Sequence, residues 1–191
     1  MKKTILICLM LFNSLFVFAQ NADTGRSVKV KFVGGAAMSS FKSLMENLSS
    51  SNEFSILVKA IKADSLTHLF DGNSPVTVFA PTNKAFEKLT TGKLDSLLQP
   101  AHKKELESLI KYHCVAGMIS SKDIAKQIKA SNGLATLTTL SGGILTARVN
   151  ENRNIVLTDE NGGQSVISQF DIKQNNGVLH IVTAVLISKS K

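Results

Sequence analysis

Residues 77–86, which read TVFAPTNKAF, constrain the fold more than any other part of the sequence. The first half of this stretch places apolar side chains on both faces of a strand, which is typical of a strand inside a sheet. Pro81 cannot donate a sheet hydrogen bond and keeps Ala80 extended. Thr82 or Asn83 then offers a side-chain oxygen to the first free amides of a helix. The stretch therefore predicts a central strand that ends at a proline and leads directly into a capped helix.

The rest of the chain divides into a helical first part and a strand-rich second part. Apolar residues recur at helical spacing, and are expected to face a core, at Phe41, Leu44, Met45 and Leu48 and again at Phe54, Leu57, Val58 and Ile61. Further short helices are predicted at residues 94–98, 106–113 and 120–128. From residue 134 onward, short β-branched runs alternate with polar turns, which predicts strands joined by hairpins. This order of elements indicates an α+β fold.

The start of the chain has the pattern of a cleaved secretory signal. Lys2 and Lys3 precede an apolar run over residues 5–18, and the small residue Ala19 comes before the polar Gln20. We expect cleavage between these last two residues. The mature protein is then secreted, periplasmic or extracellular, and has no membrane span. An uncleaved membrane anchor is the alternative.

The predicted domain organisation is simple. Residues 1–19 are the signal segment, residues 20–36 are a flexible lead that ends in an edge strand, and residues 37–188 form one domain of ordinary size. The formal net charge of the whole chain is +8. The lysines are scattered, however, tryptophan is absent, and no basic block contains interleaved aromatic residues. Nucleic acid is therefore not an expected partner.

The histidines and cysteines do not form a pattern that is typical of catalysis or metal binding. The four histidines occur singly, and Cys8 in the signal segment leaves Cys114 as the only cysteine of the mature chain. A metal site needs several converging ligands, so we expect no metal or other cofactor. His113 and Cys114 adjoin, but neighbours in an extended segment point to opposite faces. We therefore expect a non-enzymatic protein in which His113 is a core residue that donates to a backbone carbonyl and Cys114 is a buried hydrophobic residue.

Three stretches of the sequence resemble the signatures of the fasciclin (FAS1) family, and they occur in the family's order. Residues 77–86 fit the pattern TVFAPTNxAF at every position. Tyr112 and His113, followed by Gly117, are similar to the second signature, and residues 175–187, which begin NNGVLH, resemble the third. The resemblance covers almost the whole mature chain. It implies a wedge of two β-sheets with about seven strands and with several α-helices packed on one side.

For function, the resemblance implies an exported adhesion or protein-interaction module without enzymatic activity, whose partner is a cell-surface or matrix protein or a glycan. In animal members, an Asp-Ile pair before the third signature and the Tyr-His region are associated with adhesion to integrin. The matching residues here are Asp171, Ile172, Tyr112 and His113. A short signal before a solitary domain is more typical of a bacterial member, so we expect a partner other than integrin. We also expect a monomeric chain.

Two alternatives stay open from the sequence. We expect Asp171 and its neighbour Ile172 to be exposed on the border of a turn, where recognition residues usually lie. The alternative is that Asp171 only caps the turn through its own side chain. For the protein as a whole, the alternative function is a carrier of a small apolar ligand such as a carotenoid or haem.

Overall fold

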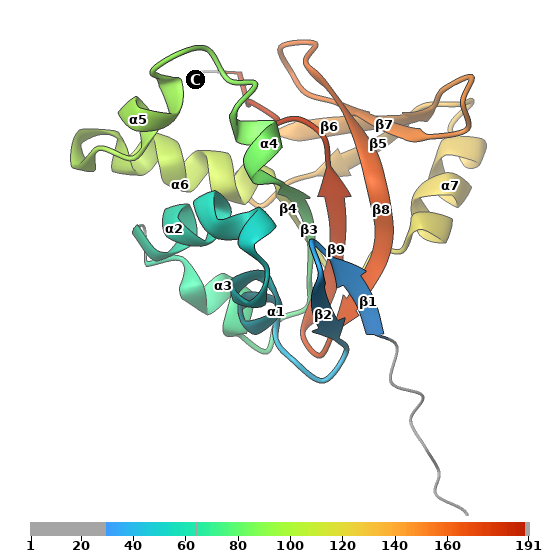
Figure 1. Ribbon diagram of the computed structural model, residues 1–191. Coiled ribbons are helices and arrows are strands. Elements are labelled where there is room, and N and C mark those ends of the chain that lie inside the picture. The colour runs from blue at the N-terminus through green and yellow to red at the C-terminus, as the bar shows by residue number, and fades with distance from the viewer. Residues whose placement is uncertain (1–29, 64, 190–191) are drawn as a thin grey trace, which may run out of the picture.

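The computed structural model describes residues 30–63 and 65–189 of the chain (Figure 1). The predicted signal segment and the part of the predicted lead before Val30 lie outside these residues. Strand β1 (Val30–Val33) corresponds to the predicted edge strand and pairs with β2 (Ala36–Ser39) in a two-stranded sheet. The domain limits at residues 37 and 188 stay a prediction.

The remaining strands in the described part of the chain form one seven-stranded sheet in the order β4-β3-β9-β8-β7-β6-β5. Their bounds are β3 (Val76–Pro81), β4 (Cys114–Ala116), β5 (Ala135–Thr138), β6 (Ile144–Val149), β7 (Ile155–Thr158), β8 (Gln164–Gln174) and β9 (Gly177–Val182). β3 and β9 are parallel, and the other neighbouring pairs are antiparallel. The long strand β8 curves from the direction of β9 toward that of β7 (Figure 1), so the sheet closes into a wedge. The predicted α+β fold is confirmed.

Helices cover the two faces of this wedge unequally. Their bounds are α1 (Leu44–Ser50), α2 (Ser55–Ala63), α3 (Thr67–Asp71), α4 (Asn83–Phe86), α5 (Lys93–Leu97), α6 (Lys103–Tyr112) and α7 (Ser121–Ala130), with short 3-10 turns η1 (Asn52–Phe54) and η2 (Pro100–His102). Figure 1 shows α1 to α6 together on one side and α7 on the other, where α7 packs against β5 and β6. One apolar core therefore lies beneath α1 to α6 and a second lies between the sheet and α7.

The first helix begins later than its apolar pattern suggests. Ser43 is the N-cap and forms a capping box with Glu46, because Ser43 Oγ accepts the Glu46 amide at 3.1 Å and Glu46 Oε2 accepts the Ser43 amide at 2.6 Å. Phe41 precedes this cap and is 54% exposed, so its predicted core position is wrong. The other three residues of the pattern are buried, as predicted.

The central strand is found where the first signature predicts it. Every residue of β3 is buried, and α4 follows directly. Thr82 stands at the N-cap of α4, but its side chain accepts no hydrogen bond there. Asn83 instead binds the start of α2 and the turn η1, since its Oδ1 accepts the Ile56 amide at 3.1 Å and its Nδ2 donates to Asn52 O at 2.8 Å. The predicted side-chain cap is therefore wrong, and Asn83 links two helices.

Strand β9, within the third signature, lies between β3 and β8, and all of its residues are buried. It ends at Val182 rather than at Ile187. The Thr183 amide still donates to Val166 O of β8 at 3.1 Å, but later backbone amides bond to side chains instead of to a strand. The Ala184 amide donates to Ser165 Oγ at 2.8 Å, and the Leu186 amide donates to a histidine ring.

Asn176, which precedes β9, joins the β8–β9 turn to two helices. Its Oδ1 accepts the Leu44 amide at 2.9 Å at the start of α1, and its Nδ2 donates to Phe70 O at 2.7 Å in α3. The Asn-Gly pair of the third signature therefore attaches the helical layer to the middle of the sheet.

Replacing Gly177 with alanine should lower the free energy of unfolding by about 2 kcal/mol, because a methyl group has no room there. A Cβ at this position would lie 2.3 Å from Val76 O and 2.7 Å from Leu44 Cδ1, and Val76 belongs to the parallel partner strand. Asn175→Ala, an exposed change in the same turn, should stay within about 0.5 kcal/mol of the parent. Urea unfolding measures both; equal midpoints for the two variants would contradict this close packing.

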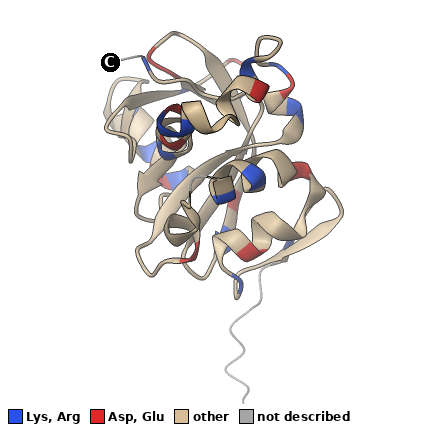
Figure 2. Cartoon of the chain, turned by 90° about the vertical axis from the view of Figure 1, so that its left-hand side faces the viewer, with Lys and Arg blue, Asp and Glu red and all other residues tan. Residues whose placement is uncertain are grey.

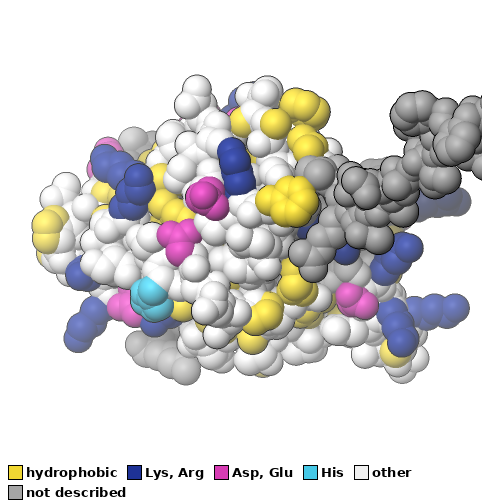
Figure 3. All heavy atoms as spheres, turned by 90° about the horizontal axis from the view of Figure 1, so that it is seen from below, with side chains coloured by type: hydrophobic (Ala, Val, Ile, Leu, Met, Phe, Trp, Pro, Cys, Tyr) yellow, Lys and Arg dark blue, Asp and Glu magenta, His cyan; other side chains and the backbone are white. Residues whose placement is uncertain are grey.

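Charged residues are dispersed over the surface. Figure 2 shows Lys and Arg positions interspersed with Asp and Glu over the helical side rather than gathered in one block. Seen from below, apolar side chains form small separate groups, and several Lys and Arg side chains lie toward the side of α7 (Figure 3). None of the helices within residues 30–63 and 65–189 has the length and apolarity that crossing a membrane requires.

Candidate functional site

His113, at the end of α6, is part of the buried framework. Its Nδ1 donates to Leu109 O at 2.9 Å, and its Nε2 accepts the amide of Leu186 at 3.0 Å. Burial lowers the pKa of His113 to about 4, so the ring is neutral at pH 7. Both ring nitrogens bond to the backbone, which confirms the predicted core histidine. The neighbouring Cys114 is also buried, as predicted, and burial raises the pKa of its thiol to about 12.

Tyr112 fixes two hairpin turns against the end of α6. Its hydroxyl donates to Ile144 O at 2.8 Å and accepts the Glu160 amide at 3.2 Å. Its ring lies against Gly143, where an added Cβ would come within 2.7 Å of Tyr112 Cε2. Burial raises the pKa of Tyr112 to about 12. The Tyr-His pair therefore holds the β5–β6 turn, the β7–β8 turn and the segment after β9 in place.

Asp171 lies at an irregularity of β8 and binds the start of α7. The register with β9 shifts between Gln169 and Ile172, and the φ angle of Asp171 is 55°, which is uncommon for a residue other than glycine. Its Oδ1 accepts the Ser121 amide at 2.7 Å and its Oδ2 accepts the Ser121 hydroxyl at 2.5 Å. Burial alone would raise the pKa of Asp171, but these hydrogen bonds, with Lys31 and His180 nearby, lower it. The carboxylate is therefore charged and oriented.

The predicted exposure of the Asp-Ile pair is wrong. Asp171 is half-buried, and Ile172 is 1% exposed in the core beneath the helices. The reason is that β8 does not end at this pair but continues to Gln174. Asp171 also does not cap the following turn, because Ser121 of α7 takes both of its oxygens. A double change of the pair to alanine would open a cavity at Ile172, so it could not separate binding from folding.

His180 supports Asp171 from the neighbouring strand. Its Nδ1 accepts the Asp171 amide at 3.4 Å and its Nε2 donates to Ile119 O at 2.9 Å. The ring stacks on Phe79 with the centroids 5.6 Å apart, and burial lowers its pKa. His180 is therefore a structural ring.

A hollow of about 330 Å³ opens beside Asp171, between β1, β8 and the start of α7. We call it the Asp171 hollow, and its lining consists of Lys31, Ser120, Lys122, Asp171, Ile172 and Lys173. The three lysines are exposed. In the described ranges, the ion pairs within 4.0 Å lie on η2, α5 and α6 and involve none of them. Lys31 Nζ donates to Phe170 O. The hollow therefore presents one ammonium group that is bonded to the backbone and two further ones around one fixed carboxylate.

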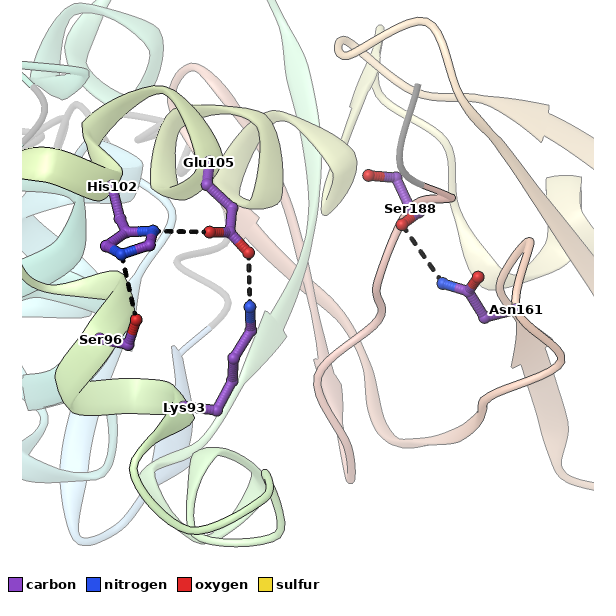
Figure 4. A network of polar contacts seen from close by, with 6 residues as sticks. All are labelled: Lys93, Ser96, His102, Glu105, Asn161 and Ser188. Atoms are coloured by element: carbon purple, nitrogen blue, oxygen red, sulfur yellow. Dashed lines mark hydrogen bonds and ion pairs between the residues drawn. The ribbon is translucent and has the colours of Figure 1, made fainter.

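A second concave site, of about 420 Å³, lies between α5 and α6 on one wall and the hairpin turns and C-terminal segment on the other. Figure 4 shows side chains of both walls. We call it the α6 cleft, and its lining consists of Leu89, Lys93, Leu97, Lys104, Glu105, Ser108, Leu109, Ser141, Gly143, Glu160, Ile187, Ser188 and Lys189. The bonds of Tyr112 and His113 shape its second wall, because they hold Glu160, Ile144 and Leu186.

The structure does not bring the four predicted binding residues together. Tyr112 and His113 stand behind the α6 cleft, whereas Asp171 and Ile172 line the Asp171 hollow. The lysines of both sites were missed because they are distant from one another in the sequence and follow no local pattern. The serine pair at residues 120–121 was visible as a helix start, but nothing local indicates its bond to a carboxylate fifty residues away. Among the described residues, no group of three or more His, Cys, Asp or Glu is placed to hold a metal ion.

This architecture defines a class of protein: an α+β module whose buried polar side chains hold its own framework, and whose concave sites have mixed charge. The chain matches the family described as the Fasciclin domain over residues 52–188, and it belongs to that family. The resemblance that the three signatures indicate is therefore confirmed.

Similar proteins come from several kinds of organism. Protein sll1483 of Synechocystis sp. is 31% identical over 166 residues, which cover 87% of this chain and 84% of that protein. Transforming growth factor-beta-induced protein ig-h3 of Oryctolagus cuniculus is 33% identical over 147 residues, which cover 75% of this chain but only 19% of that protein. A solved FAS1 domain pair from the insect cell adhesion molecule Fasciclin I aligns with a TM-score of 0.67 at 17% identity, over 84% of this chain and 66% of that one. This last likeness shows a shared fold.

Proposed function

We propose that the chain is an exported, non-enzymatic interaction module that binds a protein or glycan of a cell surface or matrix. The observation that carries the proposal is the Asp171 hollow, where a charged carboxylate in a fixed orientation is surrounded by three exposed lysines. Support also comes from the solved structure with the same fold, which belongs to an insect cell adhesion molecule.

The backbone at Asp171 supports this choice of surface. A positive φ angle at a residue other than glycine costs about 1–3 kcal/mol and persists where the surroundings enforce it, often at binding sites. Here Ser121 and His180 enforce it, since both bond to Asp171. A carboxylate that is held in one orientation beside exposed lysines suits recognition of a partner with a matching charge pattern.

The predicted binding residues have different roles in this proposal. Asp171 lies at the contact surface. Ile172 anchors β8 in the core, and Tyr112 and His113 hold the distant turns, because all three are buried. Tyr112 and His113 therefore influence binding through the framework, and Ile172 contributes only a small part of its side chain to the lining of the hollow.

Reversing two charges of the hollow should weaken binding without unfolding the protein. Lys122→Glu with Lys173→Glu should reduce binding of the fluorescently labelled chain to cells of its source organism by about tenfold or more. Each change replaces a positive charge that attracts negative groups of the partner with a negative charge that repels them. The melting curve should move little, as both side chains are exposed. Lys126→Glu with Lys129→Glu, on the same helix but outside the hollow, is the matched control. Equal binding by the two double variants would place the contact surface elsewhere.

A second candidate function, the carriage of a small apolar ligand, is favoured by the α6 cleft. Its volume of about 420 Å³ lies in the usual range for small-molecule sites, about 300–1,000 Å³. Among the described residues, its lining contains no His, Cys, Met or Tyr, which are the usual ligands of haem iron, so haem does not suit this cleft. A carotenoid would give the purified native protein visible absorbance.

A further inference from the structure

The floor of the α6 cleft is apolar. Leu97 of α5 and Leu109 of α6 line it although they are almost fully buried, so only small parts of these side chains face the cleft. Leu89 is half-buried, and Ile187, on the opposite wall, is 37% exposed. These four residues provide an apolar strip between the helical layer and the C-terminal segment. A ligand that covers the strip removes exposed apolar surface from water.

The two carboxylates of the cleft already have partners. Glu105 accepts from Lys93 Nζ at 2.5 Å and contacts His102 Nδ1 at 3.0 Å (Figure 4), and the hydrogen bond from Lys93 is the main reason why the pKa of Glu105 is lowered. Glu160, on the other wall, accepts the amide of Ile144 at 3.1 Å through Oε1 and that of Lys189 at 3.1 Å through Oε2. Neither carboxylate is therefore free to bind a cationic ligand without losing these bonds.

Two lysines of the cleft have no ion-pair partner among the described residues. Lys104 stands on the helical wall and Lys189 on the C-terminal segment, and both are exposed. Within the described part of the chain, neither has a carboxylate within ion-pair distance. The cleft therefore combines an apolar floor with uncompensated positive charge on both of its walls.

We infer that the α6 cleft binds an amphiphile with a single apolar chain and a carboxylate head, of the fatty-acid class. The hydrocarbon chain of such a ligand covers the apolar strip, and its carboxylate head lies between Lys104 and Lys189. Hydrogen bonds between charged groups are stronger than hydrogen bonds between neutral groups. A purely apolar ligand leaves the lysines unused, and a small polar anion leaves the strip exposed. This inference names the ligand class for the carrier function above, and it rests on that second candidate rather than on the Asp171 hollow.

Calorimetric titration of the full chain with dodecanoate, dodecanol and acetate tests the inference. Dodecanoate should bind at least about tenfold more tightly than dodecanol, and acetate should not bind measurably. Lys104→Ala and Lys189→Ala should each weaken dodecanoate binding about fivefold to tenfold, because each removes one charge-assisted hydrogen bond. Lys103→Ala, next to Lys104 in the same helix turn but outside the cleft lining, should leave the affinity unchanged. Ser108→Phe, which fills the cleft from α6, should abolish binding.

The outcomes separate the ligand class from the carrier function. If dodecanol binds as tightly as dodecanoate, and Ser108→Phe blocks both, the cleft carries an apolar ligand and the carboxylate head is wrong. If neither compound binds, or if Ser108→Phe leaves their binding unchanged, the cleft is not a ligand site and the carrier function fails with the inference. Dodecanoate affinities that are equal in Lys103→Ala and Lys104→Ala would also overturn the proposed position of the head group.

Discussion

Replacing His113 with alanine should lower the free energy of unfolding by about 4 kcal/mol. The change leaves the buried amide of Leu186 without its acceptor, which costs about 1–3 kcal/mol, and it removes a ring that is 2% exposed, which leaves a cavity. The same ring joins the end of α6 to the segment after β9, so the loss affects contacts between distant elements. Urea unfolding followed by circular dichroism measures the effect.

His102 provides the matched control for this change. It also belongs to a helical turn near α6, but its side chain is 44% exposed. His102→Ala should therefore change the free energy of unfolding by no more than about 0.5 kcal/mol. A His113 variant as stable as the His102 variant would show that the buried ring contributes nothing to the framework.

Acidification from pH 7.5 to pH 4.5 should remove about 2–3 kcal/mol of stability through His113 alone. The pKa of this ring is lowered by burial to about 4 in the folded protein, from an ordinary value of 6.5. Below pH 6.5 the unfolded chain therefore binds a proton that the folded chain does not, and stability falls until the pH approaches 4. Burial also lowers the pKa of His180, which adds a loss in the same direction.

Two measurements check this pH dependence. The free energy of unfolding of the parent should fall with pH over the stated window, and that of His113→Gln should fall less steeply, because glutamine does not titrate. Independently of any variant, the His113 imidazole signals in NMR spectra of the parent should show a neutral ring down to about pH 4.5. Titration of that ring near pH 6.5 would contradict the burial that the structure shows.

The sequence predicted the central strand because the signals of that strand are local. The strand β3 was visible from apolar side chains on both faces followed by Pro81. The core position of His113 was also predictable, since it continues an apolar stripe and the other histidines occur singly in the sequence. Phe41 was misplaced for an equally local reason: Ser43 and Glu46 cap the helix after it, and the capping box outweighs one apolar residue in the pattern.

The candidate sites were less predictable than the fold. Asp171 was named from the sequence, but its exposure was misjudged because β8 continues through Ile172 to Gln174. Its binding of Ser121 could not be foreseen, since the two residues lie fifty positions apart. The lysines beside it are single residues on three separate elements. No local pattern connects them.

The sequence by itself determined the division into a helical first part and a strand-rich second part, the family, and the burial of His113 and Cys114. Periodicity, proline geometry and apolar character act within a few neighbouring residues, and a single sequence records all three. Only the tertiary structure decided which distant groups the buried polar side chains bind, and where the Asp171 hollow and the α6 cleft open. The physical reason is that a hydrogen bond such as that between Asp171 and Ser121 depends on how separate elements pack, and that packing is a property of the whole chain.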